Sequence, residues 1–267
     1  MDMEQATPPI VVQGLTLGYG SNVILQDVTF TIRRNEIFII MGGSGGGKST
    51  VLRSMVGLLP PMKGHVLYGG VDFWTSDEDE RKRIMRTFGI LYQGGALWSS
   101  LTLAENVALP LEQYSDLGPE RIRDIVSFKL SLVGLSGFEH YYPSQISGGM
   151  KKRAGLARAM ALDPEILFFD EPSAGLDPVS ARHLDELILE LRSSLNATVV
   201  VVTHDLASIF AIGGNAIFLD AGAKTMIAEG HPATLLAESC DARVTNFLAR
   251  GQAQSGASGG LTAPPSR

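Results

Sequence analysis

The sequence predicts an α/β fold whose core is a mainly parallel sheet, and three observations lead to this prediction. Short apolar runs alternate with helical patterns from residue 37 onward. The run at 37–41 passes into a glycine-rich turn and then a helix. The runs at 166–169 and 198–202 each end in polar residues. Strands that alternate with helices in this way pack as a parallel sheet covered by helices.

The N-terminal part of the chain predicts a separate antiparallel unit. Residues 10–17 and 23–33 alternate apolar and polar side chains on either side of a turn at Gly18-Tyr19-Gly20, and Gly64–Val71 has the pattern of a further strand. Tyr19 lies at the turn, where a tyrosine either packs against a strand edge or contacts a ligand. We therefore expect an antiparallel β subdomain beside the parallel core.

The turn after residues 37–41 has the pattern Gly42-x-x-x-x-Gly47-Lys48-Ser49 of a P-loop. Its glycines let backbone N–H groups approach phosphate oxygens, and the start of the following helix favours anions. Lys48 can then reach the β- and γ-phosphates of a nucleotide, and the Ser49 hydroxyl can bind Mg²⁺. The alternative is a glycine-rich turn that matches by chance. The strand before it and the helix after it argue against chance.

The middle of the chain predicts an inserted, mostly helical subdomain at about residues 94–162. Pro60-Pro61 is expected to end the P-loop helix, and Ser76 is expected to cap the charged helix that follows it. A short strand, Phe88–Tyr92, ends at Gln93. Helical patterns then cover about 102–112, 119–134 and 148–161.

Two carboxylates follow the apolar run at 166–169. Asp170 is placed to hold Mg²⁺, and Glu171 is placed one residue further, where it can polarise an attacking water. The alternative is that both carboxylates are solvated at a strand end and have no function. The P-loop in the same chain argues against this alternative. The remaining predicted elements are a helix over 178–195, a strand at 198–202 followed by Thr203-His204-Asp205, strands at 215–219 and 225–229, and a helix near 231–238.

Composition narrows the class of protein. A net charge of −6 and a pI of about 5.4 argue against nucleic-acid binding, and the single Cys240 excludes an internal disulfide. We expect no signal peptide and no membrane span, hence a cytoplasmic protein with any membrane role exerted through partners. The chain has no internal repeat, which predicts one nucleotide-binding domain over residues 1–250. Residues 251–267 have the composition of a disordered tail.

Six motifs in order resemble those of ATP-binding cassette (ABC) ATPases. Ile146-Ser147-Gly148-Gly149-Met150 resembles the signature loop, and it falls between the P-loop and Asp170-Glu171. The residues that complete the resemblance are Gln93 as the Q-loop, Ser173-Ala174-Gly175-Leu176-Asp177 as the D-loop, His204 as the switch histidine and Tyr19 as the aromatic that stacks on adenine. The resemblance implies a P-loop ABC ATPase with a mainly parallel core sheet, an antiparallel β subdomain and an inserted helical subdomain.

The resemblance also assigns roles. It implies that Glu171 is the general base, assisted by His204, Gln93 and Lys48, and that Ser49, Gln93 and Asp170 hold Mg²⁺. Ser147 and Gly149 would act on the ATP of a second copy, so that two chains close head-to-tail on two ATPs. The residues implied to bind ATP are Tyr19, Gly42, Gly43, Ser44, Gly45, Gly46, Gly47, Lys48, Ser49, Thr50, Gln93, Ser147, Gly148, Gly149 and Asp177.

Two residues depart from the usual family pattern. Met150 replaces the usual Gln of the signature, and Gly43 replaces a common Pro of the P-loop. Contacts to phosphate in the family come mainly from the signature Ser and the glycine backbone. The loop with Gly43 keeps every backbone N–H. Neither change therefore argues against catalysis.

A longer stretch, Ser147–Ala159, resembles the ATPase subunit of Mla/Mce-type lipid transporters, as do Gln93–Leu97, Asn106–Pro110 and Asp241–Leu248. This resemblance implies a subunit peripheral to the cytoplasmic side of the inner membrane, under a permease dimer, with STAS-domain and Mce-domain partners and phospholipid as substrate. The alternatives are a cassette for another substrate, such as a lipoprotein or small solute, a soluble non-transport ABC ATPase, or a nucleotide-binding scaffold without turnover.

Two features of the helical part stay open at this stage. The basic residues Lys151, Lys152 and Arg153 are either a solvated helix start or a contact to a partner. Trp98, in the loop after Gln93, is either an anchor for the permease or part of the subdomain core.

Overall fold

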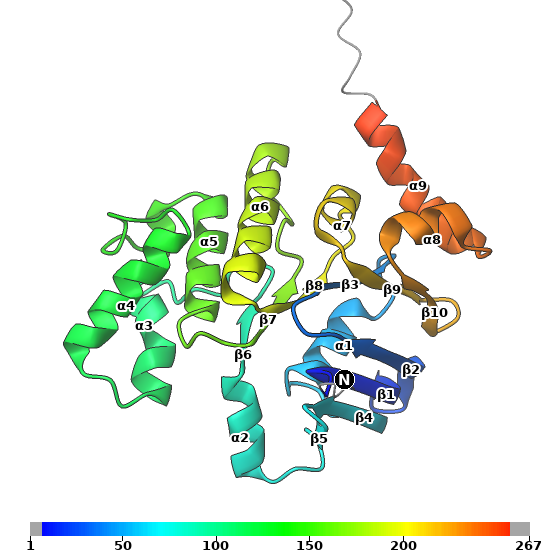
Figure 1. Ribbon diagram of the computed structural model, residues 1–267, viewed down its shortest axis with the longest axis horizontal. Coiled ribbons are helices and arrows are strands. Elements are labelled where there is room, and N and C mark those ends of the chain that lie inside the picture. Colours follow the sequence, from blue (N-terminus) through cyan, green and yellow to red (C-terminus); the bar gives the residue numbers. More distant parts are fainter. Residues whose placement is uncertain (1–6, 257–267) are drawn as a thin grey trace, which may run out of the picture.

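Two sheets organise the computed structural model, which describes residues 7–256 (Figure 1). The larger sheet has the strand order β10-β9-β3-β8-β7-β6, in which β10 is antiparallel and all other neighbours are parallel. The smaller sheet, β2-β1-β4-β5, is antiparallel throughout. The strands are β1 (Ile10–Tyr19), β2 (Asn22–Ile32), β3 (Ile37–Gly42), β4 (Lys63–Tyr68), β5 (Val71–Asp72), β6 (Phe88–Leu91), β7 (Ile166–Asp170), β8 (Thr198–Val202), β9 (Asn215–Asp220) and β10 (Thr225–Gly230).

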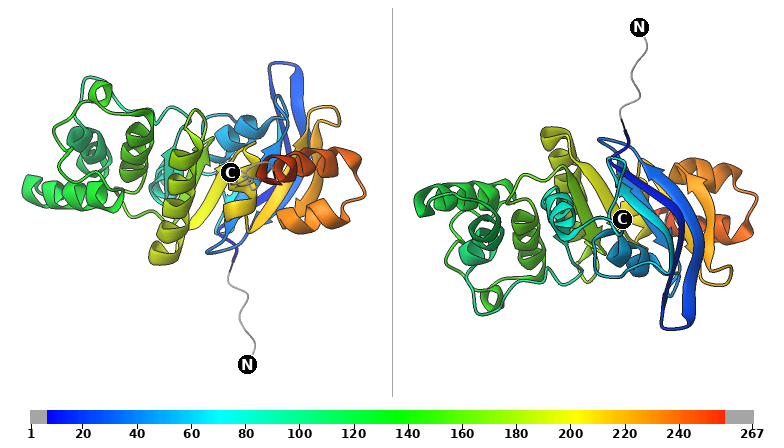
Figure 2. Two further views of the ribbon diagram at one scale, coloured as in Figure 1. Left: turned by 90° about the horizontal axis from the view of Figure 1, so that it is seen from above. Right: turned by 90° about the horizontal axis from the view of Figure 1, so that it is seen from below.

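Helices cover the larger sheet and form an arm beside it (Figure 1). Figure 2 shows the arm, made of α3, α4 and α5, at one end of the molecule, with α8 and α9 at the other end. The helices are α1 (Lys48–Met55), α2 (Glu78–Arg86), α3 (Leu103–Tyr114), α4 (Pro119–Leu132), the short 3-10 helix η1 (Pro143–Gln145), α5 (Gly148–Ala159), α6 (Pro178–Leu195), α7 (Leu206–Ile212), α8 (Pro232–Glu238) and α9 (Ala242–Gly256).

The central strand β3 separates two hydrophobic cores. All six of its residues are buried, as its continuous apolar run predicts for a strand between two parallel neighbours. Because side chains alternate along a strand, Ile39 belongs to the core that helices α3 to α9 share, whereas Phe38 and Ile40 belong to the core formed with α1 and the antiparallel sheet. The predicted α/β class, with its antiparallel subdomain and inserted helices, is confirmed.

Two predicted helix boundaries are wrong. The P-loop helix α1 ends at Met55, because Gly57 adopts a φ of 84° that a helix cannot continue, and Pro60-Pro61 lies beyond that point. The cap of α2 is Asp77, whose side chain accepts the Glu80 N–H at 2.8 Å. The predicted cap, Ser76, instead donates its hydroxyl to a backbone carbonyl one turn earlier.

The C-terminal part contains helices that sequence periodicity did not reveal. The short helix α7 follows β8 and was not predicted. The helix α9 continues to Gly256, so residues 251–256 are helical where a disordered tail was predicted. The rest of the predicted tail, residues 257–267, lies outside the described part of the chain.

Across residues 7–256, no helix has the length and apolar character needed to cross a membrane.

Candidate functional site

The P-loop lies between β3 and α1, as predicted. Gly42 has a φ of 149°, and a Cβ at this position would overlap the carbonyl oxygen of Leu219 on the neighbouring strand β9. Gly45 and Gly47 have φ values of 77° and 84°, which favour glycine. The loop is therefore a backbone cradle in which side chains would fill the space that a phosphate needs.

Lys48 is buried at the start of α1, and its ammonium donates to the carbonyl oxygens of Gly42 at 2.9 Å and Gly43 at 3.1 Å. Burial lowers the pKa of Lys48, while the negative charges of Glu171 and Asp170 oppose that shift. The lysine thus lies within a site that already contains two carboxylates.

Ser49 and Asp170 are brought together from positions far apart in the sequence. The Ser49 hydroxyl donates to Asp170 Oδ1 at 3.2 Å. Burial raises the pKa of Asp170, the hydrogen bond from Ser49 lowers it, and nearby Glu171 raises it further. Two oxygen ligands that meet beside a phosphate cradle match the preference of Mg²⁺ for a few protein oxygens completed by phosphate and water.

Glu171 has a strained backbone directly after the carboxyl end of β7. Its φ is 49°, in the left-handed region, and its N–H donates to the Val202 carbonyl at 2.8 Å. Its Oε1 lies 2.7 Å from His204 Nδ1, while Oε2 is buried and has no hydrogen-bond partner among the described residues. The carboxylate therefore has one oxygen held by His204 and one buried oxygen whose hydrogen-bonding capacity is unused among the described residues.

A cavity of about 280 Å³ joins these parts. Its lining combines P-loop residues with Glu171. Its lining residues are Ile24, Gly45, Gly46, Gly47, Lys48, Ser49, Thr50 and Glu171. A site that combines a glycine-rich backbone loop, a lysine and a carboxylate has the groups that phosphoryl transfer to water requires.

Two predicted site residues, Gln93 and Tyr19, do not line the P-loop cavity. Gln93 is exposed just beyond β6, and no described contact joins it to the P-loop. Tyr19 is 47% exposed at the end of β1, and its hydroxyl accepts a hydrogen bond from Arg53 Nη1 at 3.1 Å. The exposed ring leaves room for a planar group against it.

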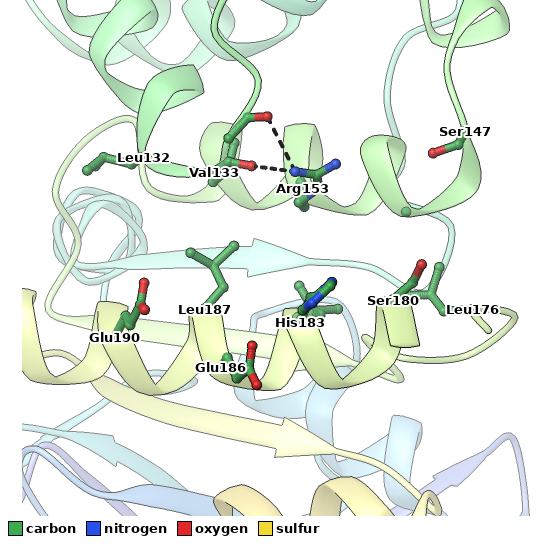
Figure 3. Close-up of a pocket in the computed structure, with 13 residues that line it drawn as sticks. Leu132, Val133, Ser147, Arg153, Leu176, Ser180, His183, Glu186, Leu187 and Glu190 are labelled. Carbon is green, nitrogen blue, oxygen red and sulfur yellow. Dashed lines mark hydrogen bonds between the residues drawn. The ribbon is translucent and has the colours of Figure 1, made fainter. Parts of the chain in front are cut away.

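The predicted signature residues lie apart from the P-loop of the same chain. Ser147 caps α5 by accepting the Met150 N–H at 3.2 Å, and Asp177 caps α6 by accepting two backbone N–H groups. Ser147 and Gly149 line a second cavity of about 410 Å³ between α5 and α6, which Figure 3 shows. No residue of the P-loop lines this second cavity.

Lys152 is a buried residue that the sequence analysis did not assign to the site. Its ammonium donates to the backbone carbonyl of Glu171 at 3.1 Å. The next residue, Arg153, donates to the carbonyls of Val133 and Gly134 at 3.1 and 3.3 Å (Figure 3). The solvated alternative is therefore wrong for Lys152. The small and apolar residues that follow it on α5 are the pattern that could have indicated a buried helix face.

Comparison with known proteins agrees with this geometry. Residues 25–174 match the family model described as ABC transporter. A "Probable ribonucleotide transport ATP-binding protein mkl" of Mycobacterium tuberculosis is 46% identical over 197 residues, which are 74% of this chain and 55% of the relative. The chain thus spans little more than half the length of these mycobacterial relatives.

Two further similarities extend over nearly the whole chain. An "Intermembrane phospholipid transport system ATP-binding protein MlaF" of Haemophilus influenzae is 39% identical over 239 residues, 90% of this chain and 89% of the relative. A solved dimeric ATP-binding cassette, in a post-hydrolysis state bound to ADP and Pi, superposes with a TM-score of 0.75 at 32% identity and covers 83% of this chain and 98% of that chain. The chain belongs to the ABC transporter family.

Proposed function

We propose that this chain hydrolyses ATP as the cassette subunit of a phospholipid transporter, closing as a dimer on ATP beneath a permease. The observation that carries the proposal is the cavity that Glu171 lines together with the P-loop residues Gly45 to Thr50. A carboxylate at that position can accept the proton of a water that attacks the terminal phosphate.

The nucleotide would lie along the P-loop, in contact with Gly42 to Thr50. The backbone N–H groups and the ammonium of Lys48 would bind the phosphates, for which Lys48 exchanges its carbonyl partners for phosphate oxygens. The exposed ring of Tyr19 would stack on adenine.

Ser49, Asp170 and Gln93 would hold Mg²⁺, and the short distance between the first two oxygens fits such a site. When bound, the ion neutralises charge on the phosphates. His204 keeps Glu171 oriented through Oε1, and its other ring nitrogen is left to contact the terminal phosphate.

The dimer follows from the separation of the two cavities. Ser147, Gly148 and Gly149 lie at the N-terminus of α5, an end that favours anions, yet they line a cavity distinct from that of the P-loop. Such a terminus can reach the phosphates of a second copy. Asp177 stabilises the start of α6 beside it. The solved dimeric cassettes support this arrangement.

Phospholipid is favoured as the substrate because the phospholipid-transport relative matches 89% of its own length, whereas the ribonucleotide-transport relative matches 55%. We further infer partners of the same kind as in the sequence analysis: a permease dimer, a STAS-domain protein and an Mce-domain protein. The chain would then be peripheral to the cytoplasmic face of the inner membrane. The rival proposal keeps the same ATPase chemistry and changes only the permease and its substrate.

Replacement of Glu171 by Gln tests the site. We expect turnover to fall by about 100-fold or more while ATP binding persists, because general-base catalysis typically contributes that much. Glu165→Gln is the matched control, since Glu165 is an exposed acid at the other end of β7. Steady-state ATPase assays and gel filtration with ATP would measure turnover and dimer formation. Turnover equal to the wild type in Glu171→Gln would refute the assigned base.

Purification of the tagged chain from native membranes in mild detergent tests the substrate. We expect a permease together with Mce-domain and STAS-domain proteins, identified by mass spectrometry. A permease of another kind would favour the rival substrate, and the absence of any membrane protein would contradict transport.

A further inference from the structure

Lys152 is a buried charged side chain in the second turn of α5. Its exposed fraction is 5%, and its ammonium donates to the backbone carbonyl oxygen of Glu171 at 3.1 Å. This is the one hydrogen bond that its ammonium makes with residues in the described range 7–256. A buried ammonium costs stability unless its interactions compensate, so an apolar side chain of similar length would suit a purely structural role better.

The residue that Lys152 contacts has an unusual backbone. At a φ of 49°, Glu171 lies in a region that costs energy for a residue with a Cβ and that persists only where neighbours hold it. On one side its N–H donates to the Val202 carbonyl, and on the other its carbonyl accepts from Lys152 and from the Ala174 N–H at 3.2 Å. Of the three groups that bond to the Glu171 backbone, two are backbone groups and only the Lys152 ammonium belongs to a side chain.

The side chain of Glu171 depends on this backbone. One carboxylate oxygen is held by His204, the other is buried without a partner among the described residues, and Glu171 as a residue lines the P-loop cavity. A rotation of the backbone at residue 171 would move the carboxylate relative to that cavity. Such displacements matter, because a shift of about 1 Å in a reacting group can cost about 100-fold in rate.

The helix that carries Lys152 is itself anchored at both ends. Ser147 caps its start, and Arg158 near its end donates to the carbonyls of Ala96 at 2.7 Å and Gly95 at 2.9 Å in the loop after Gln93. Lys152 lies between these two anchored ends. Its hydrogen bond to the Glu171 carbonyl therefore links the position of α5 to the backbone conformation of Glu171 in the same chain.

We propose that Lys152 is a positioning residue for the Glu171 carboxylate, acting from α5 through the Glu171 carbonyl. This inference rests on the proposed role of Glu171 as the base. It does not require Lys152 to touch the nucleotide. A hydrogen bond from a charged donor fixes the carbonyl more firmly than a neutral donor would.

The test compares Lys152→Met with Lys152→Arg and with Lys151→Met in the full-length chain. Lys152→Met removes the donor at similar length. It should lower kcat about 10- to 100-fold and change the KM for ATP by less than about threefold. Lys152→Arg keeps a charged donor and should restore kcat to within about threefold of the wild type. Lys151→Met removes a neighbouring charge that makes no described hydrogen bond, and its kcat should stay within about twofold.

Rates are normalised to the number of ATP-binding sites, which separates slow turnover from partial folding. Lys152→Gln is measured in parallel, since it keeps a polar group in the buried space and loses the charge. Because its neutral amide can still donate, we expect a kcat no lower than that of Lys152→Met and no higher than that of Lys152→Arg. If both variants lose ATP binding, Lys152 serves the fold and the proposal is wrong. Wild-type kcat in Lys152→Met would also overturn it.

A double variant separates this inference from the proposed function. If Lys152 acts only through Glu171, Lys152→Met should not reduce further the residual single-turnover rate of Glu171→Gln. A further reduction would mean that Lys152 acts elsewhere. Full turnover in Glu171→Gln alone would instead refute the base, and so the proposed function itself.

Discussion

Asp185 on α6 is a buried carboxylate whose ionisation should make the stability of the protein depend on pH. It is 6% exposed, accepts the Ser208 hydroxyl from α7 at 2.8 Å, and has one oxygen without a partner in the described part of the chain. Burial raises the pKa of Asp185 to about 6, the hydrogen bond from Ser208 opposes this, and the charges of Asp205 and Glu186 add to it.

The sign of the effect follows from where the proton is held. The folded state binds the proton of Asp185 more tightly than the unfolded state, in which the pKa is 3.8. The stabilisation is therefore complete below pH 3.8 and is lost as the pH rises through about 6. In full it is about 3 kcal/mol, and between pH 5 and pH 8 the protein should lose about 1.4 kcal/mol from this group alone.

Urea unfolding of the wild type and Asp185→Asn at pH 5 and pH 8 measures this loss. The variant cannot titrate at this position, so its free energy of unfolding should fall by about 1.4 kcal/mol less than that of the wild type over the same interval. Any fixed cost of the amide in the buried site cancels in the comparison between the two pH values. Glu190→Gln, an exposed acid on the same helix, is the control and should follow the wild type.

Equal pH dependence in the wild type and Asp185→Asn would refute the argument. It would mean either that Asp185 ionises as readily in the folded state as in the unfolded chain, or that water reaches its unpartnered oxygen. A larger loss in the variant than in the wild type would contradict the sign.

Two further predictions concern the arm. At Gly89 a Cβ would overlap the carbonyl of Ala159, so Gly89→Ala should cost at least about 3 kcal/mol in urea unfolding, whereas Gly94→Ala, with open space around it, should be nearly neutral. Trp98 is 63% exposed, which excludes it from the core. Trp98→Ala should reduce co-purification of the proposed permease about tenfold without changing ATP affinity. An unchanged yield, or an equal loss in the exposed aromatic control Phe128→Ala, would refute the docking role.

The residues that meet at the P-loop could be predicted because parallel strands end at the same edge of a sheet. The structure brings Ser49 to Asp170 and Glu171 to His204, and each pair joins residues that follow different strands. The order β3-β8-β7 in the sheet was not predictable from periodicity, since an apolar run indicates burial and gives no neighbour.

Helix ends were less predictable, because several local patterns compete for the same backbone groups. Both Ser76 and Asp77 can cap a helix, and the hydrogen bond of the Ser76 hydroxyl to the Asp72 carbonyl leaves the cap to Asp77. Pro60-Pro61 is a strong stop, but Gly57 stops α1 first, where a Cβ would meet the ring of Phe73. The first contact is local and the second joins residues sixteen positions apart, and helical periodicity indicates neither.

The buried charges were the least predictable feature. Lys152 lies in a run of basic residues that composition alone presents as solvated, and Asp185 lies in a helix whose other two acids, Glu186 and Glu190, are exposed. The partners of the buried charges belong to other segments, the residue after β7 for Lys152 and α7 for Asp185. A helical periodicity identifies the buried face, but a charge on that face can be interpreted only when its partner is known.

The helix α5 draws these observations together, because it makes contacts that serve different parts of the molecule. Its start presents Ser147 to a cavity away from the P-loop, its second turn holds the Glu171 carbonyl through Lys152, and Arg158 near its end holds the loop after Gln93. A rigid helix cannot shift at one of these points without shifting at the others. A partner that moves the loop after Gln93 would therefore shift both Ser147 at the start of α5 and the backbone of Glu171, the proposed base. An ATPase that drives transport in another chain needs such a coupling.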